Sequence, residues 1–201
     1  AANLLEATQD TGSFVMYSSA IKRLAVKLSK ISSDLRLLSS GPRTGFNEIN
    51  LPPMQPGSSI MPGKVNPVIP EMVNQIAFKV IGNDLTVTLA AEAGQLELNV
   101  MEPIIVLCLF QSIGILKNGM ATLRERCIDG ITANEARCRE LVERSIGLVT
   151  ALNPVLGYET CTQLAREALE KDLRLYDLVI SRKLLSKEEL DRLLLPENMI
   201  R

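Results

Sequence analysis

The stretch LPPMQPGSSIMPGKVNPVIPEMVNQ, residues 51–75, lies between two long apolar segments with helical periodicity. It contains six prolines and two glycines, which interrupt regular secondary structure, together with a serine pair, one lysine and an Asn-Pro step. The whole connection, residues 41–66, is too long for a plain turn in a helical bundle, and loops of that length often carry function. We therefore interpret the rest of the chain as the scaffold of this loop.

Several polar groups in the loop have the chemistry to bind a small anion. Ser58 and Ser59 offer two adjacent hydroxyl groups, Lys64 adds a positive charge and Asn66 adds an amide. Asn66 followed by Pro67 predicts the start of a helix, with asparagine as the N-cap and proline in the first helical position. The positive end of that helix would face the loop, which favours a site for a carboxylate.

A simpler interpretation of the same residues is structural. Glycine and proline clusters separate helices in many proteins, an asparagine before a proline is often only a cap, and a single loop lysine is usually solvated. On spacing alone, the structural interpretation is favoured.

A longer match reverses that preference. The segment GSSIMPGKVNP, residues 57–67, resembles letter for letter the signature of the aspartase/fumarase superfamily of lyases. Its continuation PVIPEMVNQ and the later segment GQLELNVMEP, residues 94–103, resemble the aspartate ammonia-lyase branch of that superfamily. The resemblance extends from ATQDTGSF near the start of the chain to LLPEN near its end, so it covers essentially the whole sequence.

This resemblance implies a reaction and roles for particular residues. Members of the superfamily cleave a C–N or C–O bond beside a carboxylate and release fumarate or a related product, through a doubly charged aci-carboxylate intermediate. By its position in the motif, Ser58 matches the general base, and Ser59 matches a residue that binds the β-carboxylate. Lys64 and Asn66 match the residues that hold the α-carboxylate. A serine hydroxyl is a weak acid, so the closed loop must stabilise its alkoxide with N–H donors and positive potential.

Three further residues receive supporting roles. Glu71 matches a family carboxylate that pairs with an active-site histidine of another subunit, although the helix dipole alone also favours an acidic residue in the first turn of a helix. We interpret Ile60 and Met61 as packing or loop-latch residues. The loop is expected to close over the substrate and expel water.

The resemblance also implies segments that this sequence does not contain. The family's site is assembled from three subunits and uses a Gly-Thr-rich segment and a Thr-His segment upstream of the matched region, whereas this chain has no histidine. We therefore expect the middle and C-terminal part of an aspartase-like subunit. It would supply one third of an active site and be inactive alone, even as a tetramer of itself.

Composition narrows the class of protein. Hydrophobic residues make up 46% of the chain and aromatic residues only 3%, so we expect an aliphatic core of packed helices. The 22 basic and 23 acidic residues nearly cancel and form no basic tract, so we predict no nucleic-acid partner. The loop glycines are wrongly spaced for a nucleotide-binding P-loop, and we expect neither a cofactor nor a metal ion.

The cysteines and the apolar runs indicate in which cellular compartment the protein is expected. Cys108, Cys127, Cys138 and Cys161 form no Cys-x-x-Cys pair, so we expect free thiols in a reducing cytoplasm. The first ten residues have neither a positive region nor an apolar core, so we expect no signal peptide. We also expect no membrane partner, because no apolar run reaches the length that a bilayer requires.

Apolar periodicity predicts an all-α fold. Over residues 13–40 it predicts a long amphipathic helix with a narrow seam: Phe14, Tyr17, Ile21, Leu24, Leu28, Ile31, Leu35 and Leu38. Two more long helices are expected over residues 67–94 and 103–128, with more apolar surface than three helices can bury among themselves. We infer that other subunits cover the rest, as the homotetramer of the family implies.

Beyond residue 130 the expected helices are shorter and more charged, near residues 133–145, 161–169, 175–183 and 186–194. Ser186 and Glu189 form a capping-box pattern at the start of the last one. We expect two domains: a partial long-helix bundle over residues 1–131, which carries the loop, and a small helical domain over residues 132–201.

Three functions are compatible with these features. The first is an aspartate ammonia-lyase that converts L-aspartate to fumarate and ammonia. The second is a fumarase, which the same loop would serve equally well. The third is a helical oligomerisation fragment without chemistry, because the seam of the first long helix has no need of Ser58.

Overall fold

The computed structural model describes residues 2–57, 61, 63–195 and 198 of the chain. The chain divides into two compact units, residues 1–133 and 134–201. Among the described residues the only strands are two short ones, and the remaining regular structure is helical. The predicted all-α fold is therefore confirmed.

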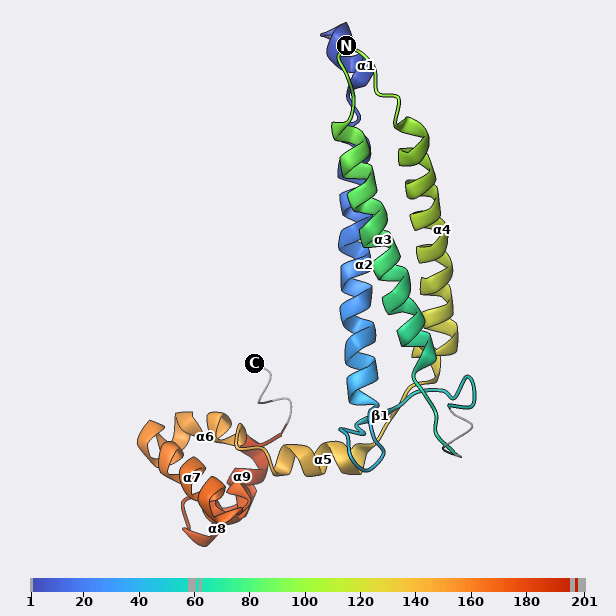
Figure 1. Ribbon diagram of the computed structural model, residues 1–201. Helices are drawn as coiled ribbons and strands as arrows, with labels where there is room; N and C mark the ends of the chain where they lie inside the picture. Colours follow the sequence, from blue (N-terminus) through green and yellow to red (C-terminus); the bar gives the residue numbers. More distant parts are fainter. Residues whose placement is uncertain (1, 58–60, 62, 196–197, 199–201) are drawn as a thin grey trace. The chain divides into compact units, whose positions relative to one another are not determined.

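Three long helices form the first unit: α2 (Gly12–Leu38), α3 (Val68–Glu92) and α4 (Glu102–Arg126). A short helix, α1 (Leu4–Gln9), precedes them. The three long helices lie side by side in Figure 1, and α3 runs antiparallel to the other two and packs against both. Each end of the three expected helices is confirmed to within two residues.

The seam of α2 is only partly the expected one. Its buried residues are Ser18, Ala25 and Ser32, which are seven positions apart. Apolar residues of the expected seam alternate with them and pack against the buried core: Ile21, Leu28 and Leu35. Because small side chains let two helix backbones approach closely, the contact line follows these small residues and not the largest apolar ones.

The other half of the expected seam points away from α3 and α4. Tyr17, Leu24 and Ile31 are 52%, 40% and 48% exposed, so this half of the expected seam is not buried within this chain. They also follow one another at steps of seven. The helix α2 therefore has two apolar stripes, of which one is covered by α3 and α4.

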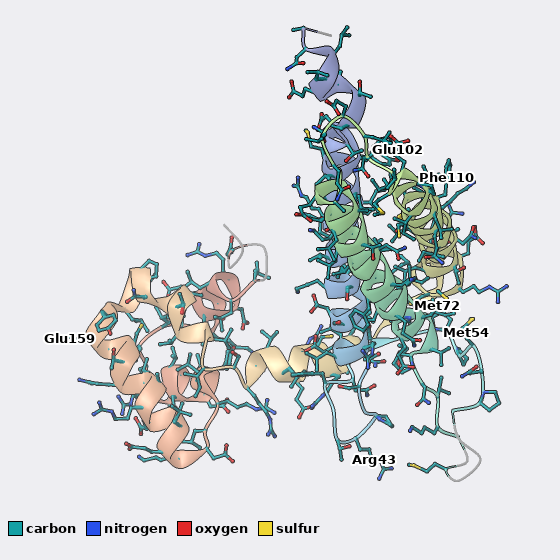
Figure 2. The ribbon with its side chains drawn as sticks, turned by 45° about the horizontal axis from the view of Figure 1, so that its top comes forward. Arg43, Met54, Met72, Glu102, Phe110 and Glu159 are labelled. Carbon is teal, nitrogen blue, oxygen red and sulfur yellow. The ribbon has the colours of Figure 1, made fainter. Side chains whose placement is uncertain are left out.

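The exposed faces of α3 and α4 are also apolar. Large side chains more than half exposed include Phe78, Leu85 and Leu89 of α3 and Leu107 and Phe110 of α4, the last of which is labelled in Figure 2. Contiguous apolar surface of this kind marks an interaction site in most proteins.

One helical segment, Glu102–Gly130, is long and apolar enough to cross a membrane by length and composition. This corrects the expectation that no apolar run reaches that length. A third of its most apolar window is buried inside the chain, where α4 packs against α3. The core helix of a soluble protein passes the same test, so the length of α4 is weak support for a membrane span.

Two short strands, which the sequence pattern did not predict, tie the loop region to the end of α4. The strand β1 (Ile49–Asn50) pairs antiparallel with β2 (Thr132–Ala133), which follows a 3-10 turn, η1 (Ile128–Gly130). The side-chain amide of Asn50 also donates a hydrogen bond of 3.2 Å to Thr132 Oγ1. The stretch before the loop is thus held at the end of the bundle where α2 and α4 finish.

The second unit contains α5 (Glu135–Glu143), α6 (Leu148–Leu156), α7 (Tyr158–Lys171), α8 (Leu175–Ser181) and α9 (Lys187–Leu193). Its core includes four fully buried side chains: Leu152, Leu164, Val179 and Leu190. The capping box of Ser186 and Glu189 is confirmed. The helix α6 was not expected, because it contains Pro154, which lacks the N–H that a helix interior uses.

Candidate active site

The loop between α2 and α3 is closed at a narrow neck. The backbone N–H of Gly57 donates a hydrogen bond of 2.7 Å to the carbonyl oxygen of Lys64, and Pro56 and Val65 form an antiparallel bridge beside it. The side-chain amide of Asn66 donates a third contact across the neck, 3.1 Å from the carbonyl oxygen of Gly57. The two ends of the GSSIMPGK segment are therefore held together by these hydrogen bonds.

Two glycines are required by this geometry. A Cβ atom at position 57 would lie 2.4 Å from the carbonyl oxygen of Lys64, closer than two such atoms approach. Gly63 has a φ of +83°, in the left-handed region that glycine adopts without steric cost. The neck therefore explains why glycine occupies both positions of the motif.

Asn66 does not cap α3, so that prediction is wrong. The helix begins at Val68, Pro67 occupies the N-cap position, and no side chain caps this helix end. The physical reason is that the Asn66 amide is directed at Gly57 across the neck. The positive end of α3 still lies at the loop, because residues 64–67 lead directly into its first turn.

Ser58, Ser59 and Ile60 lie outside the described residues. Their predicted roles, as general base, carboxylate ligand and packing residue, stay predictions. The described residues on either side of them, Gly57 and Met61, belong to the loop just described. Met61 itself is 58% exposed.

A pocket of about 650 Å³ lies against this loop. Its walls come from the end of α2 and the turn after it, from β1, from the loop and from the start of α3. The lining includes the predicted site residues Met61, Lys64, Asn66 and Glu71. Four of the seven residues proposed from the sequence are therefore on one pocket wall, and the other three are not described.

One charged residue of the pocket was missed by the sequence reasoning. Arg36, in the last turn of α2, lines the pocket, and its Nη2 atom lies 3.9 Å from Oε1 of Glu71. Its Nη1 atom donates a hydrogen bond of 3.2 Å to Oδ1 of Asn74. A basic residue in the last turn before a functional loop was the signal that could have found it.

Asn74 is a rigid anchor for that arginine. Its side chain is buried, at 4% exposure, and its amide nitrogen donates to Ser29 Oγ and to the Ser29 carbonyl oxygen, both at 2.9 Å, and to Ser33 Oγ at 3.1 Å. These contacts join α3 to α2 directly below the pocket. The guanidinium group of Arg36 is therefore attached to the buried polar part of the bundle.

The charges of the pocket suit a dianion. Lys64 and Arg36 bring two positive charges and Glu71 one negative charge, and the N-terminal end of α3 adds a partial positive charge. A dicarboxylate would gain charge-assisted hydrogen bonds from such donors. Within the described residues, no group of three His, Cys, Asp or Glu side chains could hold a metal ion.

A second hollow, of about 410 Å³, lies in the other unit and differs in kind. Two of its three basic residues, Lys171 and Arg182, are already paired with Glu167, at 2.9 Å for Lys171. These pairs hold the pKa of Glu167 below its ordinary value, chiefly through the hydrogen bond from Lys171. We therefore place the candidate site at the loop and not here.

Comparisons with known proteins match parts of both units of the chain. A family model described as "Lyase" matches residues 1–82, which include the loop, and a second, described as "Fumarase C C-terminus", matches residues 148–201. An aspartate ammonia-lyase of Pseudomonas aeruginosa is 67% identical over 200 residues. That match covers all of this chain but only 42% of the relative, so the chain spans less than half the length of the relatives it matches.

Two solved structures have the same fold. A crystal structure of a "fumarate lyase:delta crystallin" from Brucella melitensis superposes with a TM-score of 0.88 at 57% identity, covering 96% of this chain and 42% of that one. A class II fumarase from Schistosoma mansoni superposes with a TM-score of 0.89 at 34% identity, covering 97% of this chain and 41% of that one.

Proposed function

We propose, because this chain belongs to the aspartase/fumarase superfamily of lyases, that it is part of an aspartate ammonia-lyase subunit and converts L-aspartate reversibly to fumarate and ammonia once assembled. The observation that carries this proposal is the much higher identity to an aspartate ammonia-lyase than to a class II fumarase. Both matches cover nearly the whole chain, so the difference is not a matter of length.

In the proposed reaction, the alkoxide of Ser58 takes the proton on the carbon beside the β-carboxylate. The electron pair of that C–H bond moves into the carboxylate, which becomes a doubly charged aci-carboxylate. The pair then returns to form the double bond of fumarate while the C–N bond breaks and ammonia leaves. The main demand on the protein is to stabilise the charge that develops in the first step.

The described pocket supports this chemistry through its cations. We assign the α-carboxylate to Lys64 and Asn66, and the β-carboxylate to Ser59. In the described loop the Asn66 amide is bound to Gly57, so substrate binding would exchange or share that hydrogen bond. The loop neck keeps Lys64 close to the segment that carries the serines, which favours a concerted closure over substrate.

We further propose that the site is completed by other subunits of a homotetramer in the cytoplasm. The apolar faces of α2, α3 and α4 are the surfaces for that assembly. Glu71 would then pair with a histidine of a neighbouring subunit, since this chain has none. The chain alone would be inactive, because it supplies one of three required segments.

A fumarase is the second candidate, because the loop motif is shared and the structural match to a class II fumarase is close. An experiment separates the two. Fumarate formation is followed by its ultraviolet absorbance, from L-aspartate and separately from L-malate, with this chain alone and with the upstream part of a subunit supplied. Turnover of aspartate only after complementation supports the proposal, and turnover of malate instead would replace it with the fumarase.

A further inference from the structure

We propose that Arg36 is a positioning residue, which holds the Glu71 carboxylate in place for the imidazole that another subunit supplies. This inference rests on the proposed function, because it assigns a role to Glu71 in the assembled site. It adds to that function a residue of α2, which lies 22 positions before the loop serines and outside the signature motif.

The guanidinium group of Arg36 is held in place by a buried side chain of α3. Arg36 Nη1 donates to Asn74 Oδ1, and the buried amide of Asn74 is itself held by three contacts to Ser29 and Ser33. Asn74 lies three residues after Glu71 on α3, so the two side chains share one face of the helix. The arginine therefore lies beside Glu71 because its anchor is on the same face.

The same guanidinium group faces one oxygen of the Glu71 carboxylate. Its Nη2 atom approaches Oε1 of Glu71 to 3.9 Å, and both side chains are partly exposed, at 43% and 37%, on the pocket wall. A carboxylate has two oxygens and can accept several hydrogen bonds. An interaction with Arg36 through Oε1 leaves Oε2 to accept the N–H of an imidazole, which would fix the tautomer and orientation of that ring.

Arg36 also has a structural contact, because its Nη1 atom donates to Oδ1 of the buried Asn74. The ion pair with Glu71 contributes little to stability, because both of its side chains are partly exposed. The bundle is already joined here by the three contacts of Asn74. The guanidinium fork carries its donors on separate nitrogens, so Nη1 can contact the anchor while Nη2 faces the carboxylate, whereas a lysine has all its donors on one atom.

The test is a double-mutant cycle in the complete, active tetramer, with Arg36→Gln, Glu71→Gln and the pair. We expect Arg36→Gln to lower kcat about 10-fold to 100-fold, the range for groups that orient a functional side chain, with KM for L-aspartate changed less than about threefold. In the Glu71→Gln background the same change should alter kcat less than about twofold, because the residue acts through Glu71.

Controls separate this inference from a folding defect. Arg23→Gln removes the same charge from an exposed position of α2 that does not line the pocket, and it should leave kcat unchanged. Arg36→Lys, which keeps the charge but not the fork, should recover only part of the activity. Guanidinium ion added to Arg36→Ala should restore part of kcat, which a merely structural role would not predict.

The possible results are distinct. If the parent tetramer does not release fumarate from L-aspartate, the proposed function fails and this inference with it. If the parent is active and Arg36→Gln is equally active, or is equally impaired with and without Glu71, the positioning role alone is overturned. If Arg36→Gln does not assemble, the Arg36→Lys variant decides: full activity there would refute a role for the planar fork.

Discussion

The N–H of Gly57 lies 2.7 Å from the carbonyl oxygen of Lys64, and this hydrogen bond closes the neck of the loop between α2 and α3. A methyl group at position 57 would lie 2.4 Å from that same oxygen, so alanine cannot be accommodated unless the neck opens. We predict that Gly57→Ala lowers kcat/KM for L-aspartate at least about 100-fold, as expected when positioning groups are displaced by about 1 Å.

The matched control for that change is Gly82→Ala in α3, where a Cβ atom would meet nothing within 4 Å in this chain. Alanine is the better helix former by about 1 kcal/mol, so the chain with this change should unfold at a slightly higher temperature. Because Gly82 lies between Phe78 and Leu85 on the exposed apolar face of α3, the activity of this variant is compared only after it is shown to assemble. Steady-state kinetics and thermal unfolding of both variants make the comparison. Equal activity of the two would mean that the neck does not position the loop.

We predict that Ser58→Ala abolishes turnover of the assembled enzyme and leaves its oligomeric size unchanged. Removing a general base costs about 100-fold to 10,000-fold in rate, and the described core of the bundle comes mainly from α2, α3 and α4. Fumarate formation and light scattering measure the two properties. A variant that keeps most of its activity would move the base to another residue. Under the oligomerisation hypothesis, the parent itself would show no turnover.

A buried charge in the bundle gives a prediction about stability. The carboxylate of Asp84 is only 5% exposed, and it accepts hydrogen bonds from Ser18 Oγ at 2.8 Å and from Lys22 Nζ at 2.5 Å. Lys22→Met would leave this carboxylate with one partner, so we expect the free energy of unfolding to fall by about 1–3 kcal/mol. Urea unfolding at fixed protein concentration measures the change.

The control for that pair is Lys30→Met, because the Lys30–Asp34 pair is exposed on the same helix. It should change the free energy of unfolding by less than about 1 kcal/mol, the usual value for exposed pairs. A loss as large as that of Lys22→Met would show that the burial of Asp84 is not the cause.

The small residues of α2 allow its close packing against α3 and α4, which mutation can test. Ala25 is fully buried among Ala77, Val80 and Leu116, where α2, α3 and α4 meet. Ala25→Leu should destabilise the fold by about 1–3 kcal/mol, because a close-packed contact cannot take three more carbon atoms without movement of the backbone. The neighbouring Val26→Leu, at a position 50% exposed, should be nearly neutral in the same urea titration.

The cysteines give a prediction about chemical reactivity. Burial raises the pKa of the Cys127 and Cys161 thiols, so less thiolate is present at neutral pH, and the thiolate is the form that reacts. Cys108 is also buried, and Cys138 is only partly so. Mass spectrometry after brief alkylation of the native protein should find Cys138 labelled first, and the other three only after urea is added. Early labelling of Cys161 would contradict the described core of the second unit.

The long helices could be predicted from the sequence, because apolar residues at helical spacing over more than twenty positions are typical of a long amphipathic helix. The seam of α2 could not be predicted fully. Tyr17 and Leu24 have the same periodicity as the buried positions, and only the fold shows that Ser18 and Ala25 face α3. Periodicity reports that two apolar stripes exist, and it does not report which one a partner within the same chain will cover.

The candidate site, too, could be predicted from the sequence only in part. The motif identified Lys64, Asn66 and Glu71, which the structure brings to one pocket. Arg36 was not predicted as a pocket residue from the sequence. Its place in the pocket depends on Asn74, a residue on another helix 38 positions away, and on the antiparallel arrangement of α2 and α3. The cap assigned to Asn66 was wrong because its side chain turns across the neck to donate to the carbonyl oxygen of Gly57, so its own oxygen does not accept from the first turn of α3. A local sequence pattern does not report contacts between residues that are far apart in the sequence, or which of several acceptors a side chain will contact.

The exposed aromatic and leucine side chains of α3 and α4, such as Phe78, Leu89 and Phe110, also affect how long an unassembled chain would persist in a cell. If other subunits cover these faces, as we propose, a newly made copy displays before assembly the kind of surface that chaperones and proteases bind. Its abundance would then follow the supply of partners more than its own rate of synthesis. Unassembled copies would be cleared, and the cell would keep only those in which these side chains have been buried.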